Sequence, residues 1–174
     1  MTTYVLAGGC FWCLDAVFRQ LSGVTESMCG YAGDTQQNAS YYRVASGLTN
    51  HAESVQVTFD ETLLPRNILL DIFMLIHDPT SLNRQGSDVG PQYRSAMFYI
   101  DTNQQSEFEA AKHRASVVWN RPLVTELSEL DHFYPAEPEH QDYFAQHPEQ
   151  GYCQVVISPK VLKAREHYTQ FFKS

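Results

Sequence analysis

Basic residues are scarce in this sequence of 174 residues. Lys and Arg together number 12 against 20 Asp and Glu, which gives a formal net charge of −8 at pH 7. Proteins that bind nucleic acid backbones or anionic membrane surfaces usually present a basic face. We therefore expect neither nucleic acid nor a membrane among the partners of this chain.

Long apolar runs are also missing. No stretch approaches the roughly 20 residues that a membrane-spanning helix needs. The first residues lack the basic and apolar regions of a secretory signal, so we expect a cytoplasmic protein. In that compartment, the four cysteines are more often catalytic or free than paired in a structural disulfide framework.

No linker, internal repeat or low-complexity stretch divides the chain, and its length predicts one domain over residues 1–174. Alternation and helical spacing predict strands at 4–7, 24–33, 53–59, 93–100 and 123–127, and helices at 11–21, 40–45, 65–76, 107–119, 137–145 and from about residue 159. Loops are predicted at 78–92, 133–136 and 148–153. This order predicts an α+β fold with a mixed, mainly antiparallel sheet and helices packed on it.

Cys10 stands at the junction of the first strand and the first helix. The preceding Gly8 and Gly9 permit a sharp turn. Free N–H groups at a helix N-terminus favour an anion, so we expect a lowered pKa and a nucleophilic thiolate at Cys10. Free cysteines are also common apolar fillers of protein cores, and this alternative holds for Cys29.

Glu53 precedes the alternating segment in which Val55, Val57 and Phe59 share one face. It has the same parity as these apolar residues, so a strand that extends back to it places its carboxyl group in the core. Burial would raise the pKa of that group and make it a proton donor near neutral pH. The alternative is that Glu53 lies before the strand and points to water.

Several further residues could complete a site around Cys10. Phe11 and Trp12 could line an apolar slot, and Tyr41 and Tyr93 could donate hydroxyl hydrogen bonds to an oxygen of the substrate. The additional cysteines suggest that the nucleophile is oxidised and then recovered by thiol–disulfide exchange.

Five segments, in order, resemble the A-type peptide-methionine sulfoxide reductases: Gly9-Cys10-Phe11-Trp12-Cys13, Gly30-Tyr31-Ala32-Gly33, Asn38-Ala39-Ser40-Tyr41, 46–53 (SGLTNHAE) and 86–95 (GSDVGPQYRS). Asp78-Pro79-Thr80, 133–137 (FYPAE) and Gly151-Tyr152-Cys153 extend the resemblance through nearly the whole chain. The differences from the family pattern are Asp34, Ala39, Ala45 and Asn50, none of which is a proposed catalytic group.

The resemblance implies a two-layer α/β sandwich with a long irregular C-terminal segment, and a role for each matched residue. Cys10 would attack the sulfur of methionine-S-sulfoxide, free or in peptides, and Glu53 would protonate the oxygen. Tyr41, Tyr93 and Asp88 would orient that oxygen, Asp88 through water, while Phe11 and Trp12 would hold the methyl group. The resemblance implies no metal and no bound cofactor, with thioredoxin as the external reductant.

The cysteine that resolves the resulting sulfenic acid is left open between Cys13 and Cys153. Cys13 lies one helical turn from Cys10 but would need local distortion of the helix to reach disulfide geometry. Cys153 is predicted to lie in a loop that could swing, which favours it slightly, and a relay through Cys13 remains open.

Three other protein classes share parts of this pattern. A thioredoxin-like oxidoreductase would explain the strand, the Cys-x-x-Cys and the helix, but not Glu53 or the tyrosines. A zinc module would need a second ligand pair at metal spacing. A protein without enzymatic activity would carry its cysteines as fillers.

Overall fold

A six-stranded sheet forms the centre of the protein, which we describe from a computed structural model of residues 1–174. Its strand order is β7-β6-β1-β3-β2-β8, and all neighbours are antiparallel except the parallel pair β6 and β7. The strands are β1 (Thr2–Ala7), β2 (Val24–Ala32), β3 (Ala52–Phe59), β6 (Ala96–Tyr99), β7 (Glu126–Glu129) and β8 (Phe133–Pro135). The mixed, mainly antiparallel sheet is confirmed.

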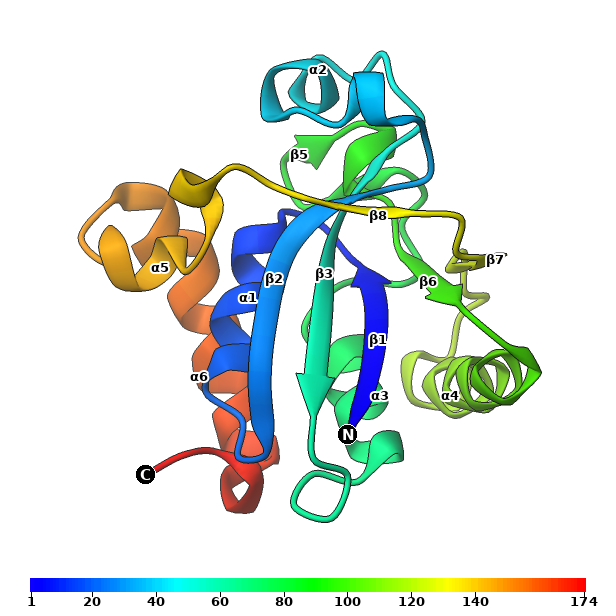
Figure 1. Cartoon of the computed structure of the whole chain (residues 1–174). Coiled ribbons are helices and arrows are strands. Elements are labelled where there is room, and N and C mark those ends of the chain that lie inside the picture. Colours follow the sequence, from blue (N-terminus) through cyan, green and yellow to red (C-terminus); the bar gives the residue numbers. More distant parts are fainter.

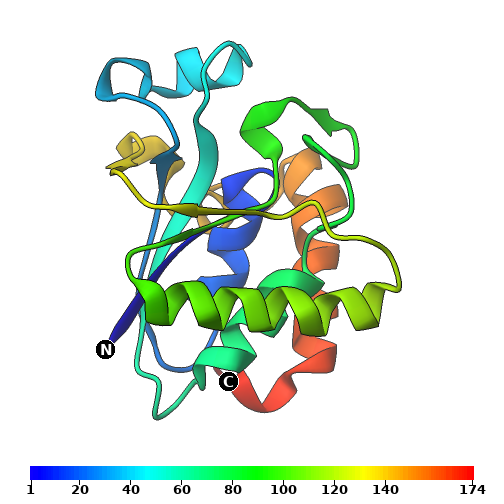
Figure 2. The same ribbon diagram turned by 90° about the vertical axis from the view of Figure 1, so that its right-hand side faces the viewer.

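The helices are α1 (Phe11–Arg19), α2 (Tyr41–Ala45), α3 (Arg66–Leu75), α4 (Thr102–Trp119), α5 (Tyr143–Gln146) and α6 (Ser158–His167), with a π-helical turn at Cys153–Ile157 before α6. The longer helices form a layer on one face of the sheet, which gives the expected two-layer α+β arrangement, whereas α2 lies beyond the end of the strands (Figures 1 and 2). None of these helices is both long enough and apolar enough to cross a membrane.

The core lies between the sheet and the helices. α1 buries Leu14, Val17 and Phe18 completely, as their spacing predicts, and β3 buries Val55 and Phe59. Each such side chain contributes about 1.5–3 kcal/mol through the removal of apolar surface from water. Both elements are therefore held rigidly at the end of the central strands where the candidate catalytic residues lie.

The directions of β1 and β3 determine which residues meet at this end of the sheet. β1 ends at Ala7 beside the start of β3 at Ala52, because the two strands are antiparallel, and α1 begins at the same end (Figure 1). Gly9 adopts φ +86° in the turn between β1 and α1, a conformation that favours glycine. The chain thus brings Cys10 next to the first residues of β3.

β8 forms the outer strand of the sheet beside β2, where the sequence predicted irregular structure. β8 pairs with β2, so that Tyr134 lies opposite Tyr31. A Cβ atom on Gly30 would lie 2.4 Å from the Phe133 ring, so only glycine permits this approach. A strand of three residues is too short to show alternation, which explains the missed prediction.

Three other predicted boundaries are wrong. α4 begins five residues early, at Thr102, because the Asp101 side chain accepts a hydrogen bond from the Gln104 N–H (2.8 Å) and caps the helix. The strand expected from Tyr93 starts at Ala96, because residues 91–93 form a 3-10 turn. The strand expected at 123–127 lies at Glu126–Glu129 as β7.

Two predicted segments have a different local structure. The expected loop 78–92 contains a short ladder of β4 (Arg84–Gln85) and β5 (Asp88–Val89). The helix expected at 137–145 is divided into a 3-10 turn and α5, because Asp142 adopts a left-handed conformation with φ 52°. The irregular C-terminal stretch therefore ends before the helical residues that begin at Gly151.

Candidate active site

Cys10 is the N-cap residue of α1, as the sequence predicts. Its backbone is extended, with φ −61° and ψ 128°, and the helix begins at Phe11. The Cys13 N–H donates to the Cys10 carbonyl at 3.1 Å, which closes a tight first turn. Cys10 is only 8% exposed, so little of its surface is in contact with water.

Glu53 lies inside the protein next to the start of α1. It is the second residue of β3, faces the core as the parity of the strand predicts, and is 1% exposed. Its Oε1 atom accepts a hydrogen bond from the Phe11 N–H at 3.1 Å. Burial raises the pKa of the carboxyl group to about 8, so Glu53 holds a proton at pH 7.

The expected lowering of the Cys10 pKa is wrong. Burial raises the pKa of the Cys10 thiol well above its usual range, and negative charge on Glu53 or Cys13 would raise it further. Hydrogen bonds from the Trp12 N–H and the Tyr152 hydroxyl oppose this rise without reversing it. Loss of hydration therefore outweighs the field of the helix terminus, and Cys10 rests as a neutral thiol.

Tyr41 and Tyr93 reach the same site from two different elements. Tyr41 opens α2, and Tyr93 ends the 3-10 turn that precedes β6. Burial raises the pKa of both phenols, that of Tyr41 to about 12, and negative charge on Glu53 or Cys10 would raise it further. Both hydroxyl groups therefore remain protonated and able to donate a hydrogen bond.

Phe11 and Trp12 belong to an aromatic cluster that the C-terminal segment completes. Phe11 is fully buried and stacks on Tyr41, with ring centroids 6.3 Å apart. Trp12 is half-buried and stacks on Tyr143 at 3.7 Å with an angle of 5° between the rings. Tyr143 could not be predicted from the sequence, because no spacing rule connects it to a residue so distant along the chain.

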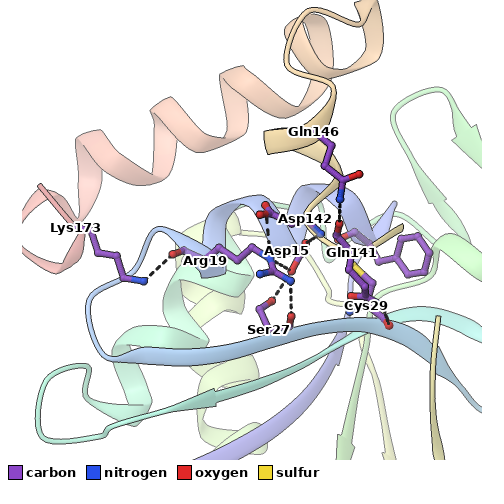
Figure 3. A network of polar contacts seen from close by, with 9 residues as sticks. Asp15, Arg19, Ser27, Cys29, Gln141, Asp142, Gln146 and Lys173 are labelled. Atoms are coloured by element: carbon purple, nitrogen blue, oxygen red, sulfur yellow. Dashed lines mark hydrogen bonds and ion pairs between the residues drawn. The ribbon is translucent and has the colours of Figure 1, made fainter. Parts of the chain in front are cut away.

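Polar contacts fix the segment that carries Tyr143 (Figure 3). The Gln141 amide accepts from the Cys29 N–H at 2.8 Å and donates to the Cys29 carbonyl at 2.9 Å, as a neighbouring strand would. The Asp142 N–H donates to Asp15, which is 1% exposed and also bonded to Arg19 and Ser27. These anchors hold the segment against β2 and α1.

The four cysteines are all free and buried. Cys29 is fully buried in β2, in agreement with its interpretation as a core residue. Cys153 is also fully buried, at the start of the π-helical turn. The prediction that Cys153 lies in a mobile loop is therefore wrong: residues 151–157 are helical and continue directly into α6.

Tyr152 is the main residue of the site that the sequence analysis did not single out. Its hydroxyl donates to Asp88 Oδ2 at 2.8 Å and lies 4.0 Å from Cys13 Sγ. Asp88 is thereby joined to the C-terminal segment. The adjoining Gly151 and Cys153 were quoted in the family resemblance, which was the only signal for this position. Elsewhere, no group of three or more His, Cys, Asp or Glu residues is arranged to hold a metal ion.

Comparison with known proteins gives consistent matches. A family model described as peptide methionine sulfoxide reductase matches residues 2–171. A peptide methionine sulfoxide reductase MsrA of Pseudarthrobacter chlorophenolicus is 54% identical over 174 residues, which cover the whole of both chains. The crystal structure of reduced Mxr1 from Saccharomyces cerevisiae superposes with a TM-score of 0.82 at 32% identity, over 87% of this chain and 88% of that one. Mxr1 has also been crystallised in complex with Trx2, and that structure shares the fold with a TM-score of 0.58 at 24% identity, over 82% and 84% of the two chains.

Proposed function

The chain belongs to the peptide methionine sulfoxide reductase family, and we propose that Cys10 and Glu53 together carry out its thiol-dependent reduction of methionine sulfoxide. The observation that carries this proposal is a buried, protonated carboxyl group at the start of the helix that Cys10 caps. A thiol supplies the electrons in this reaction, and an acid is needed because oxide is a poor leaving group.

The first step transfers oxygen from methionine sulfoxide to Cys10. The Cys10 sulfur attacks the sulfoxide sulfur while Glu53 protonates the oxygen. That oxygen passes to Cys10 as a sulfenic acid, methionine leaves, and the thiol proton replaces the one that Glu53 gave up. The Cys10 sulfur loses two electrons and the methionine sulfur gains two. A thiol of raised pKa suits this exchange, because it keeps its proton until the substrate is bound.

The surrounding residues bind and orient the substrate. Tyr41 and Tyr93 donate hydrogen bonds to the sulfoxide oxygen, and Asp88 supports this set through water. Phe11 and Trp12 contact the methyl group and select the S epimer. Two observations support these proposed roles. The raised pKa of each tyrosine keeps its hydroxyl protonated, and Phe11 packs against the Tyr41 ring.

In this proposal Cys13 attacks the sulfenic acid first and forms a disulfide with Cys10. Cys153 then reacts with that disulfide by thiol–disulfide exchange. The tight turn between the Cys13 N–H and the Cys10 carbonyl supports the first choice. Cys153 is fully buried in a helical turn, so it becomes available only after residues 151–157 unwind.

Thioredoxin is the proposed reductant of the resulting disulfide, because the related yeast protein Mxr1 forms a complex with Trx2. Oxidised proteins or free methionine sulfoxide are the substrates, and no bound cofactor is required in this scheme. Free cysteines suit a reducing compartment, which supports a cytoplasmic location. Residues 1–174 form one catalytic domain in this proposal, supported by a buried cluster that includes both Tyr4 and Phe172.

Turnover of a methionine-S-sulfoxide peptide with dithiothreitol tests this function, with the R epimer in parallel. Wild-type protein is expected to reduce only the S epimer, and Cys10→Ser is expected to be inactive although folded. Activity of Cys10→Ser would remove Cys10 from the mechanism. Reduction of a disulfide substrate without any reduction of methionine sulfoxide would instead favour a thioredoxin-like function.

A further inference from the structure

Tyr152 occupies a position between the reactive cysteines and Asp88 that the steps above do not use. Its ring meets Trp12 edge to face, with centroids 6.0 Å apart and planes at 80°. This contact directs the hydroxyl group toward the interior of the site. Its oxygen lies 2.8 Å from Asp88 Oδ2 and 4.0 Å from Cys13 Sγ, at the long end of the range for a hydrogen bond that involves sulfur.

The number of available protons indicates the direction in which a proton can move between Cys13, Tyr152 and Asp88. A tyrosine hydroxyl has one proton, and Tyr152 donates it to Asp88 Oδ2. When this proton points to Asp88, the Cys13 thiol is the donor in the contact between Cys13 and Tyr152; when it points to Cys10 instead, it lowers the pKa of that thiol. A continuous path therefore runs from the Cys13 S–H through the Tyr152 O–H to the Asp88 carboxylate.

We propose that Tyr152 is a catalytic residue of the resolving step, and that its hydroxyl relays the Cys13 proton to Asp88 as Cys13 attacks the Cys10 sulfenic acid. This inference rests on the proposed function, because the sulfenic acid is the product of the first step. The sulfur–sulfur bond forms as the bond from the Cys10 sulfur to oxygen breaks. The departing hydroxide takes a proton from Glu53 and leaves as water.

The products balance these transfers. The Cys10 and Cys13 sulfurs become a disulfide, one water is released, and Asp88 holds the proton that began on Cys13. Asp88 is half-buried and lines a cavity of about 310 Å³ together with Lys160, so it can return this proton to solvent or to Glu53. The positive charge of Lys160 lowers the pKa of Cys13 and opposes the rise that burial causes.

The proton relay can assist only one of the two candidate resolving cysteines, Cys13 and Cys153. Tyr152 and Cys153 are adjacent, so unwinding of residues 151–157 to release Cys153 would withdraw the Tyr152 hydroxyl from Asp88. The relay therefore serves Cys13 alone. Cys153 would react later, in an open state of the C-terminal segment.

Single-turnover kinetics in a Cys153→Ser background test the relay. Reduced protein is mixed with a methionine-S-sulfoxide peptide without reductant, and samples are quenched to measure both the methionine formed and the thiols lost. Tyr152→Phe removes only the hydroxyl group. Tyr168→Phe is the matched control, because Tyr168 lies at the end of α6 away from the cysteines.

In Tyr152→Phe, the ratio of the disulfide rate to the methionine rate is expected to fall by at least about 100-fold at neutral pH, relative to Tyr168→Phe. The loss should shrink as the pH rises, because Cys13 then ionises without a relay. The ionisable groups that face Cys13 are Cys10 at the N-cap of α1, Glu53 on β3, Asp88 on β5, Tyr152 just before the π-helical turn, and Lys160 on α6. Loss of packing alone would slow the reaction equally at every pH.

Three outcomes would overturn the relay: a ratio of disulfide rate to methionine rate as high in Tyr152→Phe as in Tyr168→Phe, a loss independent of pH, or methionine without disulfide in the Cys153→Ser parent. Absence of methionine in that parent would instead contradict the proposed function itself. If Tyr152→Phe does not fold, Asp88→Asn removes the acceptor of the relay. The expected result is then a fall in the ratio of disulfide rate to methionine rate, and an unchanged ratio would contradict the relay.

Discussion

The Glu53 carboxyl oxygen lies 3.1 Å from the backbone nitrogen of Phe11, so the buried acid of β3 receives the first N–H of α1. The N-terminus of α1 thus contacts the Glu53 carboxyl group and also carries Cys10. This relationship explains why a cysteine at a helix N-terminus rests as a thiol. The Phe11 N–H that could have stabilised a thiolate is bonded to Glu53, and Cys10 is itself buried.

Glu53→Gln should reduce the rate of methionine formation at least about 100-fold at pH 7, because glutamine keeps the shape of the side chain but has no acidic proton. The fold should be retained, since the amide oxygen can still accept from the Phe11 N–H. Methionine formed in a single turnover is the measurement. Glu26→Gln, an exposed position on β2, is the matched control. Equal rates in the two variants would remove Glu53 from the mechanism.

The same substitution should change how stability depends on pH. The folded-state pKa of Glu53, about 8, is higher than its usual value of 4.5. The folded protein therefore binds more protons than the unfolded chain between these values, and wild-type stability should fall as pH rises through this window. Glu53→Gln removes this loss, so its stability relative to wild type should increase by roughly 3 kcal/mol between about pH 5 and pH 8.

Urea denaturation of wild type and Glu53→Gln at both pH values measures this effect. Cys10 has a raised pKa as well, so the upper pH stays below the range in which an unfolded cysteine ionises fully. A difference in stability that does not change with pH would show that Glu53 is ionised in the folded protein at neutral pH.

Alkylation of Cys10 should follow its raised pKa. Labelling with iodoacetamide, read by mass spectrometry, is expected to rise with pH at a midpoint above the usual cysteine range of about 8.5. The midpoint should move down in Glu53→Gln, because negative charge on Glu53 opposes ionisation of the thiol. Cys29 is fully buried and should label more slowly than Cys10. A midpoint near neutral pH would restore the activated thiolate that the sequence predicts.

The sequence predicts this site where local periodicity determines the geometry. The strand, glycine turn and helix around Cys10 were predicted correctly, and strand parity placed Glu53 in the core. The Cys10 pKa was not predictable in this way, because burial depends on distant segments that close over the thiol. Tyr143 and Tyr152 were missed for a related reason: they reach Trp12 through contacts that no spacing along the chain specifies.

Gln141→Ala should loosen the C-terminal segment without altering Cys10 directly. The Gln141 amide makes three hydrogen bonds to backbone atoms of Cys29 and Ala136, and alanine leaves these atoms without partners. We expect a loss of about 1–3 kcal/mol in stability and faster proteolysis within residues 137–150. Gln37→Ala, at an exposed position, is the control.

Kinetics can separate this positioning role from a purely structural one. Because the anchored segment carries Tyr143 onto Trp12, Gln141→Ala should change the KM for the sulfoxide peptide more than kcat, and should change the fluorescence of Trp12. Trp119 also fluoresces, so the comparison is made in a Trp119→Phe background. A stability loss with unchanged KM and unchanged Trp12 emission would show that the Gln141 contacts stabilise the fold but do not position the aromatic cluster.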